Sequence, residues 1–205
     1  MRVFITGVAC VGKTTIGRRS AALMGLAFFD LDQEVENFFG TSIERLQGRF
    51  LTSHSYRNEA AKALLHLLAR PESHDSVIAL PPSGLMGGYL RAVKRSSGLV
   101  VALWDEPQNI LERITFYDSD SRPIERRLTP EEKRLYLGEI KKDMTYFGKT
   151  YARAHLRIDI AGLGVEAAAR KVKETVELYA ARAADPLERE ASEQRLPANR
   201  AARRR

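Results

Sequence analysis

One short motif restricts the possible folds of this chain more than any other feature. Residues 7–14 read Gly-Val-Ala-Cys-Val-Gly-Lys-Thr: glycine, four residues, glycine, lysine, threonine. The motif directly follows residues 3–6, which predict a buried strand, and it opens a helical pattern over residues 13–24. Glycine at both ends lets backbone N–H groups turn inward at the positive end of that helix. We therefore predict a phosphate-binding loop in an α/β protein.

The residues of this loop have separate predicted roles. Lys13 is placed to bridge the β and γ phosphates of ATP, and the Thr14 hydroxyl is placed to bind Mg²⁺. Cys10 is a candidate reactive thiol beside Lys13, and the simpler interpretation is a small residue that fits the loop. The predicted nucleotide contacts come from Gly7, Ala9, Cys10, Val11, Gly12, Lys13, Thr14 and Thr15.

Strands and helices alternate along the rest of the chain. Apolar and β-branched runs predict strands at 27–30, 77–80, 99–103 and 156–160. Helical periodicity predicts helices at 33–47, 53–69, 86–95, 107–115, 131–147 and 165–181. This alternation favours a five-stranded parallel sheet with helices on both faces, a three-layer α/β/α architecture, in one domain over residues 1–180.

Two segments do not follow this pattern. Residues 116–133 are polar and turn-rich, and a long polar insertion in a compact α/β domain predicts a mobile lid. Residues 181–205 contain only two large apolar side chains, Leu187 and Leu196, and predict a basic, disordered tail.

Composition limits the compartment and the partners. With 205 residues, 44% of them hydrophobic, the chain can bury one core. It has no long apolar run, so no membrane association is expected. A single cysteine suits a reducing compartment, and we expect a cytoplasmic protein.

The net charge of +7 consists of +4 over residues 122–153 and +3 over 181–205. No aromatic platform accompanies these basic residues, so no dedicated nucleic-acid site is expected.

Two carboxylates follow the second predicted strand. Asp30 and Asp32 lie at its carboxyl end, where open α/β sheets place their ligands, and strand alternation directs both to the same side. One can then hold Mg²⁺ through water while the other accepts a proton from an attacking hydroxyl. A helix-capping pair is the alternative, because a helical pattern begins at Gln33.

Taken together, these motifs resemble the shikimate kinase family, a branch of the nucleoside-monophosphate-kinase-like P-loop fold, over about residues 1–180. The resemblance rests on residues 7–19, Phe29-Asp30-Leu31-Asp32 with Glu36, residues 40–43, Tyr56-Arg57, Arg122-Pro123 and Arg157-Ile158-Asp159. It implies an ATP- and Mg²⁺-dependent enzyme that transfers the γ-phosphate to a hydroxyl of a small acidic metabolite, with shikimate the first candidate. We expect a monomer.

The resemblance also implies roles for single residues. Asp30 would lie in the water shell of a Mg²⁺ that Thr14 binds. Asp32 would bind the substrate hydroxyl as the base, and Arg122 in the lid would close on the phosphates beside Lys13. Arg57 would grip the substrate carboxylate, and Arg113 would stack on adenine.

Two stretches on the acceptor side depart from the family pattern. The family has three glycines after the third strand, where this chain reads Leu80-Pro81-Pro82-Ser83-Gly84, and proline donates no N–H. The family's second carboxylate-binding arginine falls in the stretch 141–146, Lys-Lys-Asp-Met-Thr-Tyr. We expect Ser83, Gly84 and Lys142 to serve the substrate there, although lysine lacks the two-pronged guanidinium.

These departures leave three functions open. The first is a divergent shikimate kinase. The second is a related kinase for another small acceptor, such as a gluconate-like sugar acid or a nucleoside or nucleotide. The third is a nucleotide-binding regulator that has lost phosphate transfer.

Overall fold

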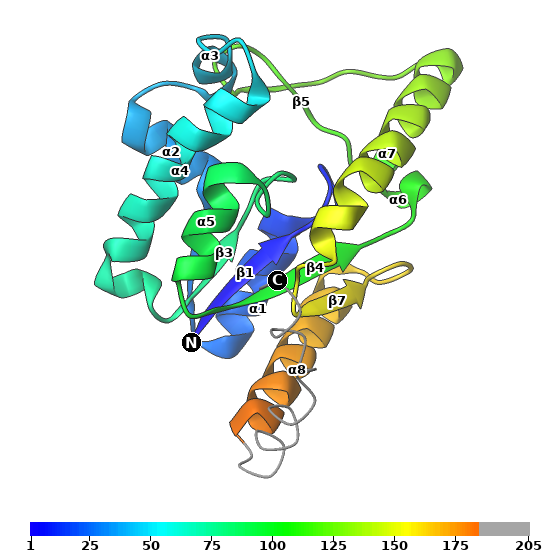
Figure 1. Ribbon diagram of the computed structural model, residues 1–205. Helices are drawn as coiled ribbons and strands as arrows, with labels where there is room; N and C mark the ends of the chain where they lie inside the picture. The colour runs from blue at the N-terminus through cyan, green and yellow to red at the C-terminus, as the bar shows by residue number, and fades with distance from the viewer. Residues whose placement is uncertain (185–205) are drawn as a thin grey trace, which may run out of the picture.

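The chain folds around a five-stranded parallel sheet (Figure 1). The computed structural model describes residues 1–184, so most of the predicted tail lies outside the described residues. The strands are β1 (Arg2–Thr6), β2 (Ala27–Asp30), β3 (Ser76–Ala79), β4 (Gly98–Trp104) and β7 (Leu156–Asp159). Their order is β2-β3-β1-β4-β7, and every neighbouring pair is parallel. The phosphate loop therefore leaves the central strand at its carboxyl end, as the sequence predicts.

Helices cover both faces of the sheet. They are α1 (Lys13–Met24), α2 (Leu31–Phe39), α3 (Ile43–Gln47), α4 (Ser53–Ala69), η1 (Pro71–Ser73), α5 (Gly87–Arg95), α6 (Pro107–Glu112), α7 (Pro130–Tyr151) and α8 (Val165–Ala184). Among the described residues, no helix is long and apolar enough to cross a membrane.

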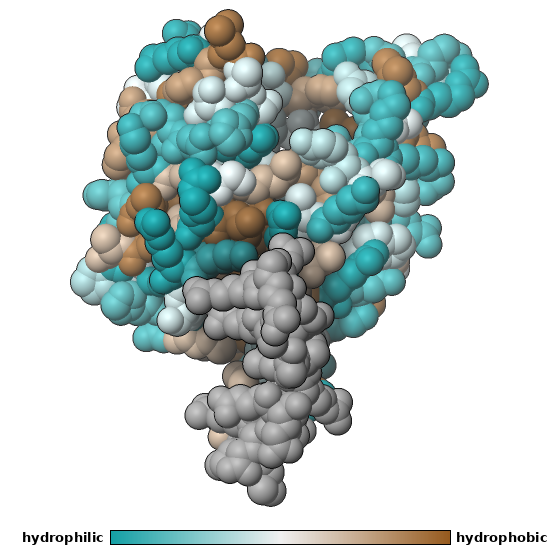
Figure 2. All heavy atoms as spheres, viewed as in Figure 1, coloured by the Kyte–Doolittle hydropathy of each residue, from teal (hydrophilic) through white to brown (hydrophobic). Residues whose placement is uncertain are grey.

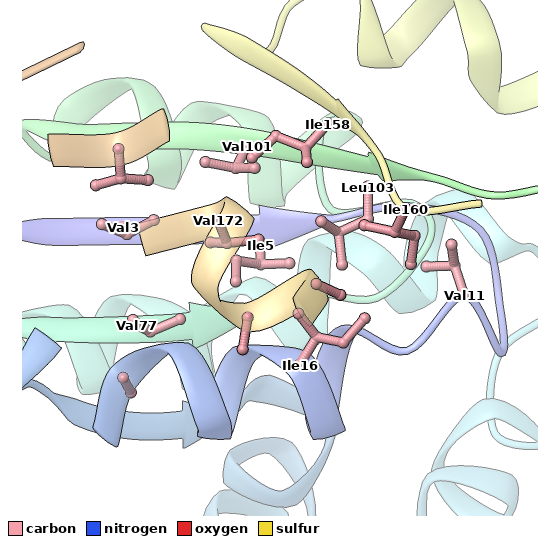
Figure 3. Packing of buried hydrophobic residues seen from close by; sticks show 14 of the residues in the cluster. Val3, Ile5, Val11, Ile16, Val77, Val101, Leu103, Ile158, Ile160 and Val172 are labelled. Atoms are coloured by element: carbon pink, nitrogen blue, oxygen red, sulfur yellow. The ribbon is translucent and has the colours of Figure 1, made fainter. Parts of the chain in front are cut away.

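Alternation along β1 divides the core into two layers. Val3 and Ile5 point to the side of α1 and α8, where they pack with residues such as Ile16 and Val172 (Figure 3). Phe4 points to the opposite side, into a cluster with α2, α4 and α5. Strands buried on both faces are characteristic of parallel α/β sheets, and the three-layer architecture agrees with the prediction.

The predicted helix over residues 33–47 is wrong in one respect, because the structure breaks it into α2 and α3. Gly40 has a φ of 62°, in the left-handed region, and its N–H bonds to the Glu36 carbonyl to end α2. Ser42 then begins α3 by accepting the Arg45 N–H. The break turns α3 toward the segment between α6 and α7.

That segment forms a small hairpin of β5 (Phe116–Tyr117) and β6 (Pro123–Ile124). The Asp118 carboxylate accepts the N–H groups of Asp120 and Arg122 and so closes the hairpin tip. After the hairpin, Thr129 and Glu132 form a reciprocal cap that starts α7, with Pro130 in its first turn. In Figure 1 the chain crosses from the α3 side to the far end of α7, and the space-filling view shows the surface hollowed below this crossing (Figure 2).

Candidate active site

The phosphate loop adopts the left-handed backbone conformations that its glycines allow. Gly7 has a φ of 151° and Gly12 a φ of 105°. A Cβ on Gly7 would lie 2.8 Å from the Leu103 carbonyl oxygen and 2.9 Å from a Val11 methyl carbon, so any side chain there would force the loop to move. Cys10 also has a positive φ, 57°, and is half-buried. The loop is thus shaped by its glycines, and its Cys10 adopts a conformation that side chains rarely take.

Among the other predicted nucleotide residues, the side chains point in different directions. Val11 is buried in the core beneath the loop, whereas Ala9 and Thr15 are exposed. The contribution of Val11 to a nucleotide would therefore come from its backbone.

Lys13 curls back over the loop that precedes it. Its Nζ donates to the Val8 carbonyl oxygen at 2.8 Å. Burial lowers the pKa of the Lys13 ammonium, and the nearby Asp32, Cys10 and Asp30 act to raise it again. The charge is therefore held at the mouth of the loop, where phosphate oxygens would meet it.

The two residues predicted to hold Mg²⁺ touch each other. The Thr14 hydroxyl donates to Asp30 Oδ2 at 2.5 Å, and Asp30 Oδ1 accepts the backbone N–H of Asp32 at 3.0 Å. Asp30 is therefore the cap of α2, and Asp32 is left without this capping role. Hydroxyl and carboxylate oxygens are the ligands that Mg²⁺ prefers, so this pair fits the ion. No cluster of three or more His, Cys, Asp or Glu side chains within residues 1–184 offers an alternative site.

Asp32 lies where two cavities meet. Asp32 is an exposed residue that lines both of them, and the surrounding protein removes part of the water from its carboxylate. This desolvation, followed by the negative charge of Asp30, raises the pKa of Asp32 to about 6, although Lys13 acts in the opposite direction. A carboxylate with this pKa is mostly ionised at neutral pH and still basic enough to take a proton.

We name the first of these two cavities the acceptor pocket. It has a volume of about 490 Å³, and its lining includes Asp32, Tyr56, Arg57, Ser83, Asp143 and Phe147. The Arg57 Nε is buried and has no hydrogen-bond partner among the described residues. Arg57 is the cationic residue of the pocket lining, so its guanidinium is suited to bind an anionic group there.

The segment after β3 takes a tight turn beside this pocket. Pro81, Pro82 and Ser83 line the pocket, and Gly84 does not. Gly84 instead donates its N–H to the Pro81 carbonyl at 2.8 Å, and a Cβ there would lie 2.5 Å from Leu80 Cβ. Tyr151 of α7 donates its hydroxyl to the Pro82 carbonyl at 3.1 Å. Gly84 therefore shapes the turn, and Ser83 is the member that faces the pocket.

The second cavity, which we name the lid cavity, is acidic. It has a volume of about 570 Å³, and Thr14, Asp30, Asp32, Glu36, Glu44 and, from the hairpin, Ser121 are among its lining residues. The Ser121 hydroxyl bonds to Glu36 and also lies 2.5 Å from Glu44 Oε2. Ser42 donates to the Ser119 carbonyl at 2.6 Å. These contacts attach the hairpin to α2 and α3, over the site.

Three predicted site residues lie apart from the phosphate loop and from both cavities. Arg122 is exposed on the hairpin, and its backbone N–H bonds to Asp118. Arg113, at the end of α6, pairs with Asp105, which is only 2% exposed. Lys142 points to solvent and pairs with Glu139 at 2.7 Å. The structure therefore brings Lys13, Thr14, Asp30, Asp32, Arg57 and Ser83 together and leaves Arg113, Arg122 and Lys142 apart from them.

Sequence reasoning missed two acidic residues. Asp105 holds Arg113 and also accepts from Asn109 and the Glu106 N–H, both at 2.7 Å. Burial acts to raise the pKa of Asp105, but these hydrogen bonds outweigh it and keep that pKa below its usual range. Asp143 lines the acceptor pocket in place of its neighbour Lys142. Its only sequence signal is its position next to that lysine.

Comparison with known proteins identifies the family of this chain. A family model described as shikimate kinase matches residues 9–177. A shikimate kinase of Thermus thermophilus is 31% identical over 172 residues, which cover 84% of this chain and 88% of that protein. The fold matches the crystal structure of a shikimate kinase from Bacteroides thetaiotaomicron with a TM-score of 0.69 and 20% sequence identity, and the match covers 86% of this chain and 98% of that one. It also matches the solved structure of a shikimate kinase from Acinetobacter baumannii in complex with shikimate. There the TM-score is 0.65 and the sequence identity 23%, and the match covers 87% of this chain and 93% of that one. These matches confirm the predicted fold class. The chain belongs to the shikimate kinase family.

Proposed function

We propose that this protein transfers the γ-phosphate of ATP to a hydroxyl of shikimate and forms shikimate 3-phosphate. One observation carries the proposal: Asp32 lines both the acceptor pocket and the lid cavity, and Thr14 of the phosphate loop also lines the lid cavity. A hydroxyl placed over Asp32 would face both the base that takes its proton and the phosphate that it attacks.

The phosphate side of the reaction depends on residues 7–15. Backbone N–H groups of the loop and the Lys13 ammonium bind the phosphates of ATP. Thr14 and Asp30 would hold Mg²⁺, which neutralises charge on the phosphates when it is bound. Lys13 stabilises the negative charge that shifts toward the leaving oxygen.

The acceptor side depends on Asp32 and Arg57. Arg57, which lines the acceptor pocket, binds the carboxylate of the acceptor through its guanidinium. Asp32 accepts the proton of the attacking hydroxyl, and its pKa of about 6 suits this task at neutral pH. Arg122 reaches the phosphates when the hairpin closes further, and Arg113 contacts adenine. Closure limits the transfer of phosphate to water.

A second candidate is a kinase for a related small hydroxylated acid. Two observations favour it. Pro81 and Pro82 line the pocket where family members have glycines, and Asp143 faces the pocket from the stretch 141–146, in which the family has its second carboxylate-binding arginine. Both changes alter the walls around the acceptor and leave the phosphate loop unaffected.

A coupled ADP-release assay distinguishes these functions. Shikimate is compared with gluconate, other sugar acids and nucleosides at saturating ATP and Mg²⁺, with Asp32→Asn as the control variant. We expect shikimate to give the highest kcat/KM and Asp32→Asn to abolish release. Higher kcat/KM with another acid would establish the second candidate. ATP binding without turnover of any acceptor would refute the kinase proposal and favour a nucleotide-binding regulator.

The expected compartment and assembly state belong to the same proposal. The single cysteine supports a reducing, cytoplasmic environment. We expect a monomer, which light scattering of the purified protein at assay concentration would test, and a dimeric mass would contradict it.

A further inference from the structure

The acceptor pocket has an unusual charge for a site that binds an acid. Its charged lining residues are Asp32, Arg57 and Asp143, so their formal sum is −1. Arg57 is the only cation among the lining residues. The pocket is thus suited to one anionic group, placed at Arg57, and provides no second cation for another.

Asp143 reaches this pocket because of its position on α7. It lies four residues before Phe147, on the same side of the helix, and both side chains line the pocket. Lys142, one residue earlier, is rotated by about 100° around the helix and points to solvent. The sequence pair Lys142-Asp143 therefore presents a carboxylate to the acceptor, and the lysine lies outside.

The carboxylate of Asp143 has no partner of its own in the part of the chain that the structure describes. Residues 1–184 provide no hydrogen bond or ion pair to it, and Lys142 is engaged by Glu139. Asp143 is exposed, and partial desolvation of its carboxylate, followed by the charge of Glu139, raises its pKa. A carboxylate accepts several hydrogen bonds when it is ionised, so Asp143 presents free acceptor atoms to any molecule in the pocket.

We propose that Asp143 is a specificity-determining residue of the acceptor pocket. It accepts hydrogen bonds from donor groups of the bound acid and repels a second anionic group. The acceptor class is therefore a monocarboxylate whose carboxylate binds Arg57 and which also carries hydroxyl or ammonium donors. Dicarboxylates and phosphorylated acids are rejected. This inference rests on the proposed function and adds to it a selection rule that family membership does not supply.

The test compares Asp143→Ala with a matched control, Glu139→Gln. Both changes remove one negative charge from the same helix, and Glu139 does not line the pocket. Isothermal titration calorimetry measures the Kd of shikimate without ATP, and the ADP-release assay measures kcat and KM. Loss of a hydrogen bond to a charged group predicts a Kd and KM raised by about 10- to 100-fold in Asp143→Ala, since such bonds contribute roughly 1.5–3 kcal/mol. Glu139→Gln should leave both values close to wild type.

Two further comparisons identify the contact itself. Two shikimate analogues are titrated into the wild-type protein and into Asp143→Ala. Each analogue lacks one of the two hydroxyls that do not receive the phosphate. For the analogue that lacks the hydroxyl bound by Asp143, Asp143→Ala should no longer raise the Kd. Tartrate, a small hydroxylated dicarboxylate, should compete with shikimate at least tenfold better in Asp143→Asn than in wild type.

Several results would overturn the role of Asp143. A lower Kd for shikimate in Asp143→Ala would show that the carboxylate repels the substrate. Equal shifts in Asp143→Ala and Glu139→Gln would show a general effect of charge. Normal binding by wild type without turnover would contradict the proposed function alone, because the calorimetric comparison of the variants does not depend on phosphate transfer.

Discussion

The pH dependence of turnover tests the environment of Asp32 directly. The pKa of Asp32 is raised to about 6 by desolvation and by Asp30. The base acts only when it is ionised, so activity should increase as the pH rises through this value. With a pKa of about 6, the ionised fraction is about 9% at pH 5, about 50% at pH 6 and about 91% at pH 7. The kcat/KM for the acceptor should therefore rise about tenfold from pH 5 to pH 7 and then level off.

The assay measures initial ADP release at saturating ATP and Mg²⁺, at constant ionic strength, over pH 5–8. The kcat/KM for the acceptor is the appropriate quantity because it reports groups of the enzyme before the acceptor binds. Asp32→Asn should lower it by about 10²- to 10⁴-fold and remove the inflection. Glu72→Gln, an exposed charge on η1 outside both cavities, is the control and should keep the wild-type profile.

A second variant tests the cause of the shift. Glu44 is one of the carboxylates that raise the pKa of Asp32. Glu44→Gln should therefore move the inflection to lower pH. A wild-type profile that stays flat between pH 5 and pH 7, or an Asp32→Asn enzyme with near-normal turnover, would refute the assignment of Asp32 as the base.

Three further predictions concern the phosphate loop. Lys13→Ala should weaken ATP binding, measured by calorimetry, and should lower phosphate transfer, since the ammonium would no longer meet the phosphates; unchanged kinetics would contradict this role. Gly7→Ala should lower the free energy of unfolding by about 1–3 kcal/mol in denaturant titrations, because the new Cβ would lie 2.8 Å from the Leu103 carbonyl oxygen in a left-handed backbone. Wild-type stability together with wild-type ATP affinity would contradict this strain. Complete alkylation of Cys10 should block ATP binding, since any adduct would occupy the loop. Cys10→Ala treated with the same reagent is the control, and full activity of the labelled wild-type protein would show that the thiol points away from the nucleotide.

The phosphate loop and the sheet could be predicted because their signals are local in the sequence. A glycine-rich turn between a strand and a helix determines its own shape, and buried parallel strands read as short apolar runs. The break at Gly40 was missed, although it too is local, because helical periodicity continues across it. Periodicity reports which face is apolar and does not report where the helix ends.

The walls of the acceptor pocket could not be predicted in the same way. Arg57 on α4 and Asp143 on α7 are far apart in sequence and meet only when both helices pack near the sheet. Whether Lys142 or Asp143 faces the pocket depends on the rotation of α7 about its axis, which tertiary packing sets. The pairing of Arg113 with buried Asp105 has the same origin, since the strand end and the helix end meet only in the folded chain.

The continuity of α7 has a mechanical consequence. Its 22 residues form one helix of about 33 Å, at 1.5 Å per residue. Its first residue follows the hairpin, its middle carries Asp143, and its last residue bonds to the turn at Pro82. A rigid tilt of about 10° about the Pro82 end would move the hairpin end by about 6 Å, given that length. A helix that tilted in this way would act as a lever arm, because a small shift of the pocket wall would become a larger displacement at the hairpin.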